Sequence, residues 1–305
     1  MRKFRFLEQP FFLQTKIFPH FRGVRGGFPM NPFILKNGTF LAAGEKLFTV
    51  ADAETLLFSE KIRAIRNSFP FLEETLDLLL LKFRIFNEPL PDILRSGGKD
   101  LKRQMERLLV KNKLYKSAVI SVYFFRNGID TDYILSAGPL GTFEFELKNK
   151  GLLVDVFDKM PKAISGLSNL SVGSETVWKV AASHLPGSGY DEFLLINSED
   201  KIIEGIGKKL FLVKNDKITG VSASAGAYMD VSGAIVPILA KKTQLSYSET
   251  DGFTTDQLYQ ADELFLSDAV YGIHSILGFR EKRYYSTKTR ELNAALNGYL
   301  IRTNF

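Results

Sequence analysis

Residues 190–205, YDEFLLINSEDKIIEG, decide the fold of this chain because they place a polar turn between two apolar runs. Asn197 and its neighbours are turn-forming residues, so the stretch predicts a β-hairpin. Residues 210–221, LFLVKNDKITGV, repeat the pattern with Asn215 at the turn. Two hairpins in direct succession indicate a sheet in this half of the chain.

The segments around these hairpins extend the sheet. Residues 168–182, SNLSVGSETVWKVAA, are typical of a loop that runs into an amphipathic helix, and residues 231–245 predict a helix interrupted near Pro237. Residues 261–279, ADELFLSDAVYGIHSILGF, predict a buried strand that runs into a turn. Many short strands with few helices favour a curled sheet or pseudo-barrel.

The first half of the chain has a different pattern. Residues 33–41, FILKNGTFL, contain an Asn-Gly turn between apolar runs, the strongest short signal for a hairpin in the sequence. Residues 71–86 and 92–114 have apolar positions at helical spacing. Residues 117–128 and 132–140 are rich in β-branched and aromatic residues, which predict strands. Together these elements predict an α+β domain.

A chain of 305 residues is long enough for two hydrophobic cores. Glycine and proline between short apolar runs suggest that residues 141–165 connect two domains. We therefore expect a small α+β domain over residues 30–145 and a larger pseudo-barrel domain over residues 146–305. Residues 1–29 are expected to form a flexible N-terminal extension.

Composition excludes several classes of function. The formal charge is +6, but no nucleic-acid-reading element accompanies it, so nucleic-acid binding is not expected. There is no cysteine, and the three histidines lie far apart, so no metal site is expected. No apolar run reaches the roughly 18 residues of a membrane-spanning helix. We expect a cytoplasmic protein that does not associate with membranes.

The order and spacing of four stretches resemble those of the class IV aminotransferases. The stretches are SNL at 168–170, YDEFLLINSEDKIIEG, LFLVKNDKI and ADELFLSDAVYGI. These fold-type-IV pyridoxal-phosphate enzymes include branched-chain and D-amino-acid aminotransferases and aminodeoxychorismate lyase. The resemblance implies a two-domain α+β fold of the D-amino-acid-aminotransferase type, with a small N-terminal α/β domain and a C-terminal pseudo-barrel. It also implies pyridoxal 5′-phosphate as cofactor and a homodimer.

The resemblance also indicates that the catalytic lysine is missing. In the most similar subgroup the loop reads Ser-Asn-Leu-Lys, so the lysine position falls on Ser171, and a hydroxyl group cannot form an imine. A serine at this position is expected to cap the helix that follows. Lys209 could replace the lysine, but the pair Lys208-Lys209 is expected to face solvent because charged side chains are seldom buried.

The other cofactor contacts that the resemblance implies are partly retained. Glu204 matches the glutamate that hydrogen-bonds the pyridine nitrogen. Leu78 stands where a phosphate-binding arginine is expected. Two turns, VSGA at 231–234 and SDAVYG at 267–272, match the phosphate-binding turns, although VSGA lacks the first glycine and the arginine of the family's pattern. The residues assigned to the phosphate are Ser232, Gly233, Ser267, Asp268 and Ala269.

These matches and losses lead to two hypotheses. The first is a class IV aminotransferase-like protein with a degenerate pyridoxal-phosphate site, which acts as a non-catalytic homologue that binds a ligand or serves as a scaffold. A small anionic or amino-acid-like molecule would be its ligand. The alternative is an active aminotransferase or aminodeoxychorismate lyase that uses another lysine, such as Lys209.

Overall fold

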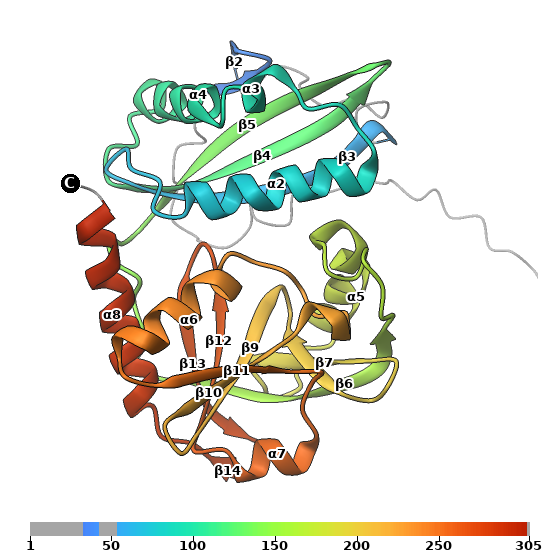
Figure 1. The fold of residues 1–305 in the computed structure, drawn as a ribbon, viewed down its shortest axis with the longest axis vertical. Helices are drawn as coiled ribbons and strands as arrows, with labels where there is room; N and C mark the ends of the chain where they lie inside the picture. The colour runs from blue at the N-terminus through green and yellow to red at the C-terminus, as the bar shows by residue number, and fades with distance from the viewer. Residues whose placement is uncertain (1–32, 43–53, 304–305) are drawn as a thin grey trace, which may run out of the picture. The chain divides into compact units, whose positions relative to one another are not determined.

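A computed structural model describes residues 33–42 and 54–303 of the chain (Figure 1). The described residues form two β-sheets, and helices pack against each of them. One sheet is formed by the first half of the chain and the other by the second half. The expected extension over residues 1–29 lies outside the described residues.

The first sheet is antiparallel and has the strand order β2-β1-β5-β4-β3. The predicted Asn-Gly turn is present, since Asn37 and Gly38 both have positive φ, the conformation that a two-residue hairpin turn requires. The strands are β1 (Phe33–Lys36), β2 (Thr39–Ala42), β3 (Leu56–Ile65), β4 (Ser117–Asn127) and β5 (Asp130–Leu140).

Helices α2 (Leu72–Phe86), α3 (Asp92–Arg95) and α4 (Lys99–Lys111) accompany this sheet. The single helix expected over residues 92–114 was wrong. Gly97 and Gly98 adopt the left-handed conformation and separate α3 from α4. A side chain at Gly98 would also collide with Leu76 of α2, so the break allows α2 to approach closely.

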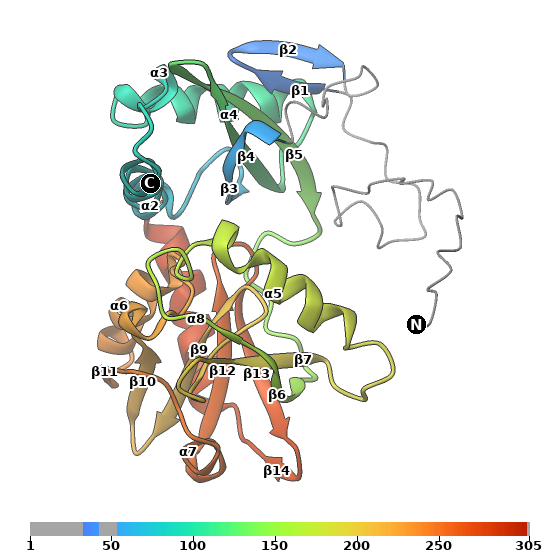
Figure 2. The same cartoon turned by 90° about the vertical axis from the view of Figure 1, so that its right-hand side faces the viewer.

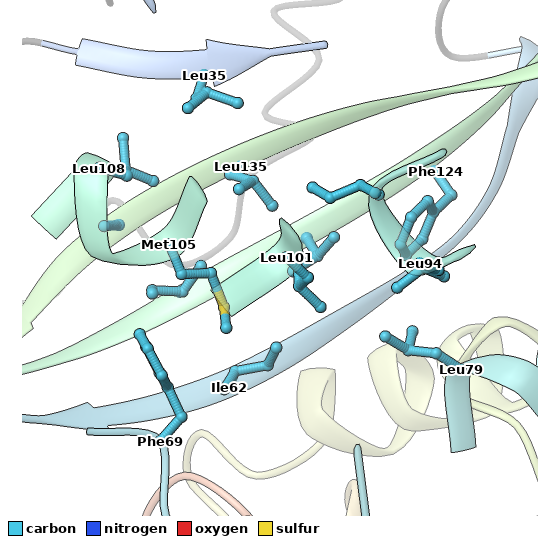
Figure 3. Packing of buried hydrophobic residues seen from close by; sticks show 14 of the residues in the cluster. Leu35, Ile62, Phe69, Leu79, Leu94, Leu101, Met105, Leu108, Phe124 and Leu135 are labelled. Carbon is cyan, nitrogen blue, oxygen red and sulfur yellow. The ribbon is translucent and has the colours of Figure 1, made fainter. Parts of the chain in front are cut away.

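The core of this half lies between the sheet and helices α2 and α4. Figure 3 shows Ile62 and Phe124 of the sheet facing Leu79 of α2 and Met105 of α4. All four side chains are almost completely buried. Burial of apolar surface on one face of the sheet therefore holds these elements together.

The second sheet closes on itself. Its strand order is β11-β10-β9-β12-β13-β6-β7-β8, and β8 also pairs with β9, so the strands from β9 to β8 form a ring. This confirms the predicted pseudo-barrel. The strands are β6 (Leu152–Lys162), β7 (Glu192–Asn197), β8 (Ile202–Gly205), β9 (Lys208–Lys214), β10 (Lys217–Val221), β11 (Ser246–Thr250), β12 (Glu263–Asp268), β13 (Gly272–Phe279) and β14 (Lys282–Arg283).

Strand β6 corrects an expectation from the sequence. Residues 141–165 were expected to connect two domains, yet residues 152–162 form a strand of the barrel. It pairs in parallel with β13 on one side and with β7 on the other. Parallel partners are distant in sequence, so no local turn marks the strand. Lys162, its last residue, enters the site described below.

Four helices accompany the barrel. Figure 2 shows α5 (Ser171–Ser183) running beside β6 and β7, and its Ala181 packs with Phe157 and Phe193 of these strands. The other helices are α6 (Ser232–Lys242), α7 (Thr255–Gln260) and α8 (Thr287–Thr303). Helix α6 continues through Pro237, contrary to the predicted interruption, because buried Ile235 and Val236 hold it against the barrel.

The described helices give no candidate for a membrane span. Within residues 33–42 and 54–303, no helix combines the length and the apolar character that crossing a bilayer requires.

Candidate functional site

The candidate site centres on Glu204 of β8, whose side chain is completely buried. Its Oε2 atom accepts hydrogen bonds from Lys162 Nζ at 2.7 Å and from the backbone N–H of Tyr228 at 2.6 Å. Its Oε1 atom accepts a third from the indole N–H of Trp178 at 2.8 Å. Both oxygens of this carboxylate therefore have protein donors.

Lys162 lies at the end of β6, from where its side chain enters the same interior. Only 2% of it is exposed. Besides Glu204, its ammonium group donates to the carbonyl oxygen of Ser168 at 3.0 Å. The Trp178 ring lies 5.9 Å from Nζ, and the Trp178 and Tyr228 rings pack in a T-shaped arrangement. Aromatic rings and a carboxylate therefore surround the ammonium group.

Burial affects both partners of this ion pair. Burial raises the pKa of Glu204, and the charge and hydrogen bond of Lys162 act against that rise. Burial lowers the pKa of Lys162, while Glu204 acts in the opposite direction. Each residue thus compensates the desolvation of the other, and removing either one would leave an uncompensated buried charge.

Ser171, which the sequence placed at the lysine position, is the first residue of α5 and is half-buried. The expected helix cap was wrong. Leu170 is the N-cap residue, with extended φ and ψ, and the cap has no side-chain hydrogen bond. The serine that lies against Lys162 is Ser168, which is buried and whose carbonyl also accepts from Ser174 Oγ.

Lys208 and Lys209 were both expected to face solvent, and for Lys209 this prediction was wrong. Its side chain is buried, and Nζ donates to the carbonyl of Val221 at 3.2 Å. Burial lowers the pKa of Lys209, while nearby Asp230 opposes the shift. Lys208 points the other way and pairs with Glu192. Successive residues of a strand alternate between its faces, so one lysine of the pair had to face inward.

The two predicted phosphate-binding turns lie together, but a carboxylate of the chain itself occupies them. The backbone N–H of Ser232, at the start of α6, donates to Asp230 Oδ1 at 2.7 Å. The backbone N–H of Ala269 donates to Asp230 Oδ2 at 3.1 Å. Ser232 Oγ lies 3.4 Å from the carbonyl of Ser267, and Gly233 packs against the Lys209 side chain. Asp230 therefore bridges the two turns.

Asp268, the third carboxylate of this region, is held in its charged form. Its Oδ1 atom accepts from the backbone N–H groups of Val270 and Tyr271, and Oδ2 lies 2.9 Å from His274 Nε2. Burial opposes the charge, but His274 and these N–H groups outweigh it and lower the pKa of Asp268. Burial raises the pKa of Asp230 to about 6, and the negative charge of Asp268 adds to the rise.

Little space remains between the two turns. The cavity that Ser232, Ser267, Asp268 and Ala269 help to line has a volume of about 10 Å³. One water molecule needs about 10–15 Å³ of such volume, so a phosphate group does not fit. Among the described residues, no three His, Asp or Glu side chains gather in a way that could hold a metal ion.

Three side chains that define this site were not predicted from the sequence: Lys162, Trp178 and Asp230. Lys162 lies in the segment interpreted as a connection. Trp178 packs against the barrel, and its N–H group reaches Glu204. Asp230 directly precedes the VSGA turn and had no local signal. The one usable hint was its position directly before the predicted helix, because aspartate side chains often accept hydrogen bonds from the first N–H groups of a helix.

Comparisons with known proteins agree on the fold. No family model matches the chain. A probable branched-chain-amino-acid aminotransferase of Aquifex aeolicus is 32% identical over 99 residues, which are 30% of this chain and 32% of that protein. A putative branched-chain-amino-acid aminotransferase of Methanocaldococcus jannaschii is 28% identical over 116 residues, 38% of this chain and 37% of that protein. The matched part thus spans about a third of the length of these curated relatives.

Solved structures match over nearly their whole length. The branched-chain aminotransferase of Thermoproteus uzoniensis with norvaline has a TM-score of 0.75 at 19% identity, covering 88% of this chain and 95% of that one. The Escherichia coli branched-chain amino acid aminotransferase has a TM-score of 0.76 at 20% identity, covering 88% and 94%. A PLP-bound hypothetical aminotransferase from Mycobacterium tuberculosis has a TM-score of 0.76 at 11% identity, covering 89% and 99%.

Proposed function

Starting from the class IV aminotransferase fold that the chain has, we propose that this protein is a non-catalytic aminotransferase homologue. Its pyridoxal-phosphate site is filled by its own side chains. The observation that carries the proposal is the buried Lys162–Glu204 pair, in which the carboxylate expected to hold a pyridine nitrogen is already satisfied. We further propose that the protein is a cytoplasmic homodimer that serves as a scaffold or binds a ligand.

The Glu204 end of the site does not fit the cofactor. Its two oxygens accept from Lys162, Trp178 and the Tyr228 backbone. A pyridinium N–H group would have to displace Lys162. The displaced ammonium group would then lose its carboxylate within a buried environment, which typically costs about 3–5 kcal/mol.

The phosphate end does not fit either. The backbone N–H groups of Ser232 and Ala269 donate to the carboxylate of Asp230. A phosphate dianion would meet the negative charges of Asp230 and Asp268, and like charges at close range repel. Leu78, where a phosphate-binding arginine was expected, packs against the hydrophobic core.

The two buried lysines of this site, Lys162 and Lys209, do not offer a free amine for imine chemistry. An unprotonated primary amine forms an imine with an aldehyde. Lys162 and Lys209 both use Nζ as a hydrogen-bond donor, the first to Glu204 and the second to Val221. Ser171 carries no amine. These contacts support a protein that neither tethers the cofactor nor carries out transamination.

Borohydride reduction of the purified protein tests the proposal. After incubation with pyridoxal phosphate and removal of the unbound cofactor, we expect no absorbance band near 400 nm before reduction and, by peptide mass spectrometry after it, no lysine of the barrel interior that carries the cofactor. The PLP-bound aminotransferase of Mycobacterium tuberculosis, treated identically, serves as the positive control. Reduced cofactor on a lysine of the barrel interior would overturn the proposal.

One observation favours the alternative of an active enzyme with a substitute lysine. Lys162 and Lys209 are both buried amines whose pKa burial lowers, and a lowered pKa makes a lysine a better nucleophile. The same experiment decides between the two functions. If the cofactor is found on either residue, the matching variant, Lys162→Arg or Lys209→Arg, must abolish both the modification and the absorbance band.

A further inference from the structure

We propose that Lys162 and Asp230 are internal ligands that occupy the two ends of this site, the Glu204 carboxylate and the backbone N–H groups of Ser232 and Ala269. Lys162 supplies a cation to Glu204, and Asp230 supplies an anion to the backbone N–H groups of Ser232 and Ala269. The two side chains thereby provide the charges that a protonated pyridine and a phosphate would bring. This inference rests on the proposed function and extends it, because it names the residues that exclude such ligands.

The first internal ligand is positioned by several elements at once. Lys162 ends β6, Glu204 belongs to β8 and Trp178 belongs to α5. The carbonyl of Ser168 accepts from Lys162 and from Ser174, so the loop before α5 is fastened to the same ammonium group. This arrangement has a polar partner for each group of the pair, as a ligand-binding site has for its ligand.

The second internal ligand closes the anion-binding turns. The carboxylate of Asp230 places one oxygen on each turn, at 2.7 Å from the Ser232 nitrogen and 3.1 Å from the Ala269 nitrogen. Backbone N–H groups at the start of a helix bind anions well, because the helix dipole is positive there. A carboxylate in that place competes directly with any external phosphate.

A short segment links the two closed ends. The backbone N–H of Tyr228 donates to Glu204, and Asp230 follows two residues later. Asn169 holds this segment in place. Its side-chain Nδ2 donates to the carbonyls of Ala223 and Ala227, and its backbone carbonyl accepts from the backbone N–H of Met229. A substitution at one end should therefore affect the contacts at the other end. We expect the effects of substitutions at Lys162 and Asp230 on the free energy to be non-additive.

The two ends can be tested separately with two probes. Lys162→Ala frees Glu204 and is expected to admit pyridoxine, which has no phosphate. Asp230→Gly frees the backbone N–H groups and is expected to admit inorganic phosphate. The double variant is expected to bind pyridoxine 5′-phosphate at least about tenfold more tightly than the wild-type protein does. Pyridoxine 5′-phosphate has no aldehyde, so binding is measured without imine formation.

The chain contains one tryptophan, Trp178, which gives a direct readout. Its indole N–H donates to Glu204, so a ligand that reaches this carboxylate should change the tryptophan fluorescence. Isothermal titration calorimetry then supplies the dissociation constants. Lys179→Ala is the matched control, because Lys179 is the next residue of α5 and is exposed, in a pair with Glu175.

Folding of each variant is verified by far-ultraviolet circular dichroism and thermal unfolding. If Lys162→Ala does not fold, Lys162→Met retains most of the side-chain volume and still frees Glu204. Binding of each probe to the matching variant, with none to the wild-type protein or the control, supports the proposal. It is overturned if the wild-type protein binds pyridoxine 5′-phosphate as tightly as the double variant does, or if the folded double variant does not bind it.

These outcomes differ from the failure of the proposed function. An imine on the wild-type protein would remove the non-catalytic role itself. A folded double variant that binds none of the probes would leave that role intact and remove only the assignment of Lys162 and Asp230 as internal ligands.

Discussion

Each half of the described chain contains a buried lysine–glutamate pair, and the two pairs differ in their surroundings. In the first sheet, Lys82 of α2 pairs with Glu60 of β3, and their side chains are 1% and 12% exposed. In the barrel, Lys162 and Glu204 are 2% and 0% exposed. Both lysines are equally buried, so the difference lies in the carboxylates.

The carboxylate of Glu60 reaches the surface, whereas that of Glu204 is enclosed. Besides Lys82, the donor described for Glu60 is the backbone N–H of Lys61. Glu204 has three donors from three different elements. Water can solvate a carboxylate that loses its lysine at the surface, but cannot do so in the interior. The barrel pair is therefore part of an enclosed hydrogen-bond network, while the carboxylate of the first pair is partly exposed.

Removing the lysine from each pair should give the largest difference in unfolding free energy between the two pairs. We expect Lys162→Ala to lower the free energy of unfolding by about 3–5 kcal/mol, because it leaves Glu204 buried and unpaired. Lys82→Ala should cost roughly 1–3 kcal/mol, because solvent reaches Glu60. Urea denaturation of both variants measures the two losses. Equal losses would show that enclosure of the carboxylate does not distinguish the pairs.

The pH dependence of Asp230 extends the comparison to a buried carboxylate that backbone N–H groups hold. Burial raises the pKa of Asp230 from 3.8 to about 6. The folded state therefore favours the neutral form of Asp230 more than the unfolded state does. The stability that Asp230 contributes below pH 4 is lost as the pH rises through 6. We expect the unfolding free energy of the wild-type protein to fall, relative to Asp230→Asn, by roughly 2–3 kcal/mol over that interval.

Denaturant unfolding of both proteins between pH 4 and pH 7 measures this difference. Subtracting the Asp230→Asn curve removes the contribution of Glu204, whose pKa is also raised by burial. Parallel curves for the two proteins would contradict the assignment of the shift to Asp230.

An exposed ion pair should contribute least to the unfolding free energy. Lys179 and Glu175 lie one turn apart on α5, and their side chains are 66% and 44% exposed. Solvent screens such pairs, so Lys179→Ala should change the unfolding free energy by no more than about 0.5 kcal/mol. A loss comparable with that of Lys162→Ala, measured in the same urea titration, would mean that burial does not control the strength of these pairs.

Much of the fold was accessible from local sequence patterns. The turns at Asn37, Asp200 and Asn215 lie between the strands that were expected on either side of them. Helix α2 lies within residues 71–86, and α5 begins within residues 168–182 and ends at Ser183. These predictions depend on turn chemistry and on the spacing of apolar residues, which act over a few residues.

The candidate site was accessible only in part. Glu204 was singled out because it matches the pyridine-binding glutamate of the family that the sequence resembles, and it does lie at the centre of a buried polar network. Lys162 was missed because β6 pairs in parallel with strands that are distant in sequence. Lys209 was expected at the surface, since nothing local tells which of two adjacent lysines faces the barrel interior.

The sequence by itself determined the hairpin turns and several of the helices, because each of these follows from residues close together in the chain. Only the tertiary structure decided that Lys162 forms an ion pair with Glu204 and that Asp230 accepts hydrogen bonds from the backbone N–H groups of Ser232 and Ala269. These contacts join segments that barrel closure brings together. Their charges are stable in the interior only because hydrogen bonds and opposite charges offset the cost of burial.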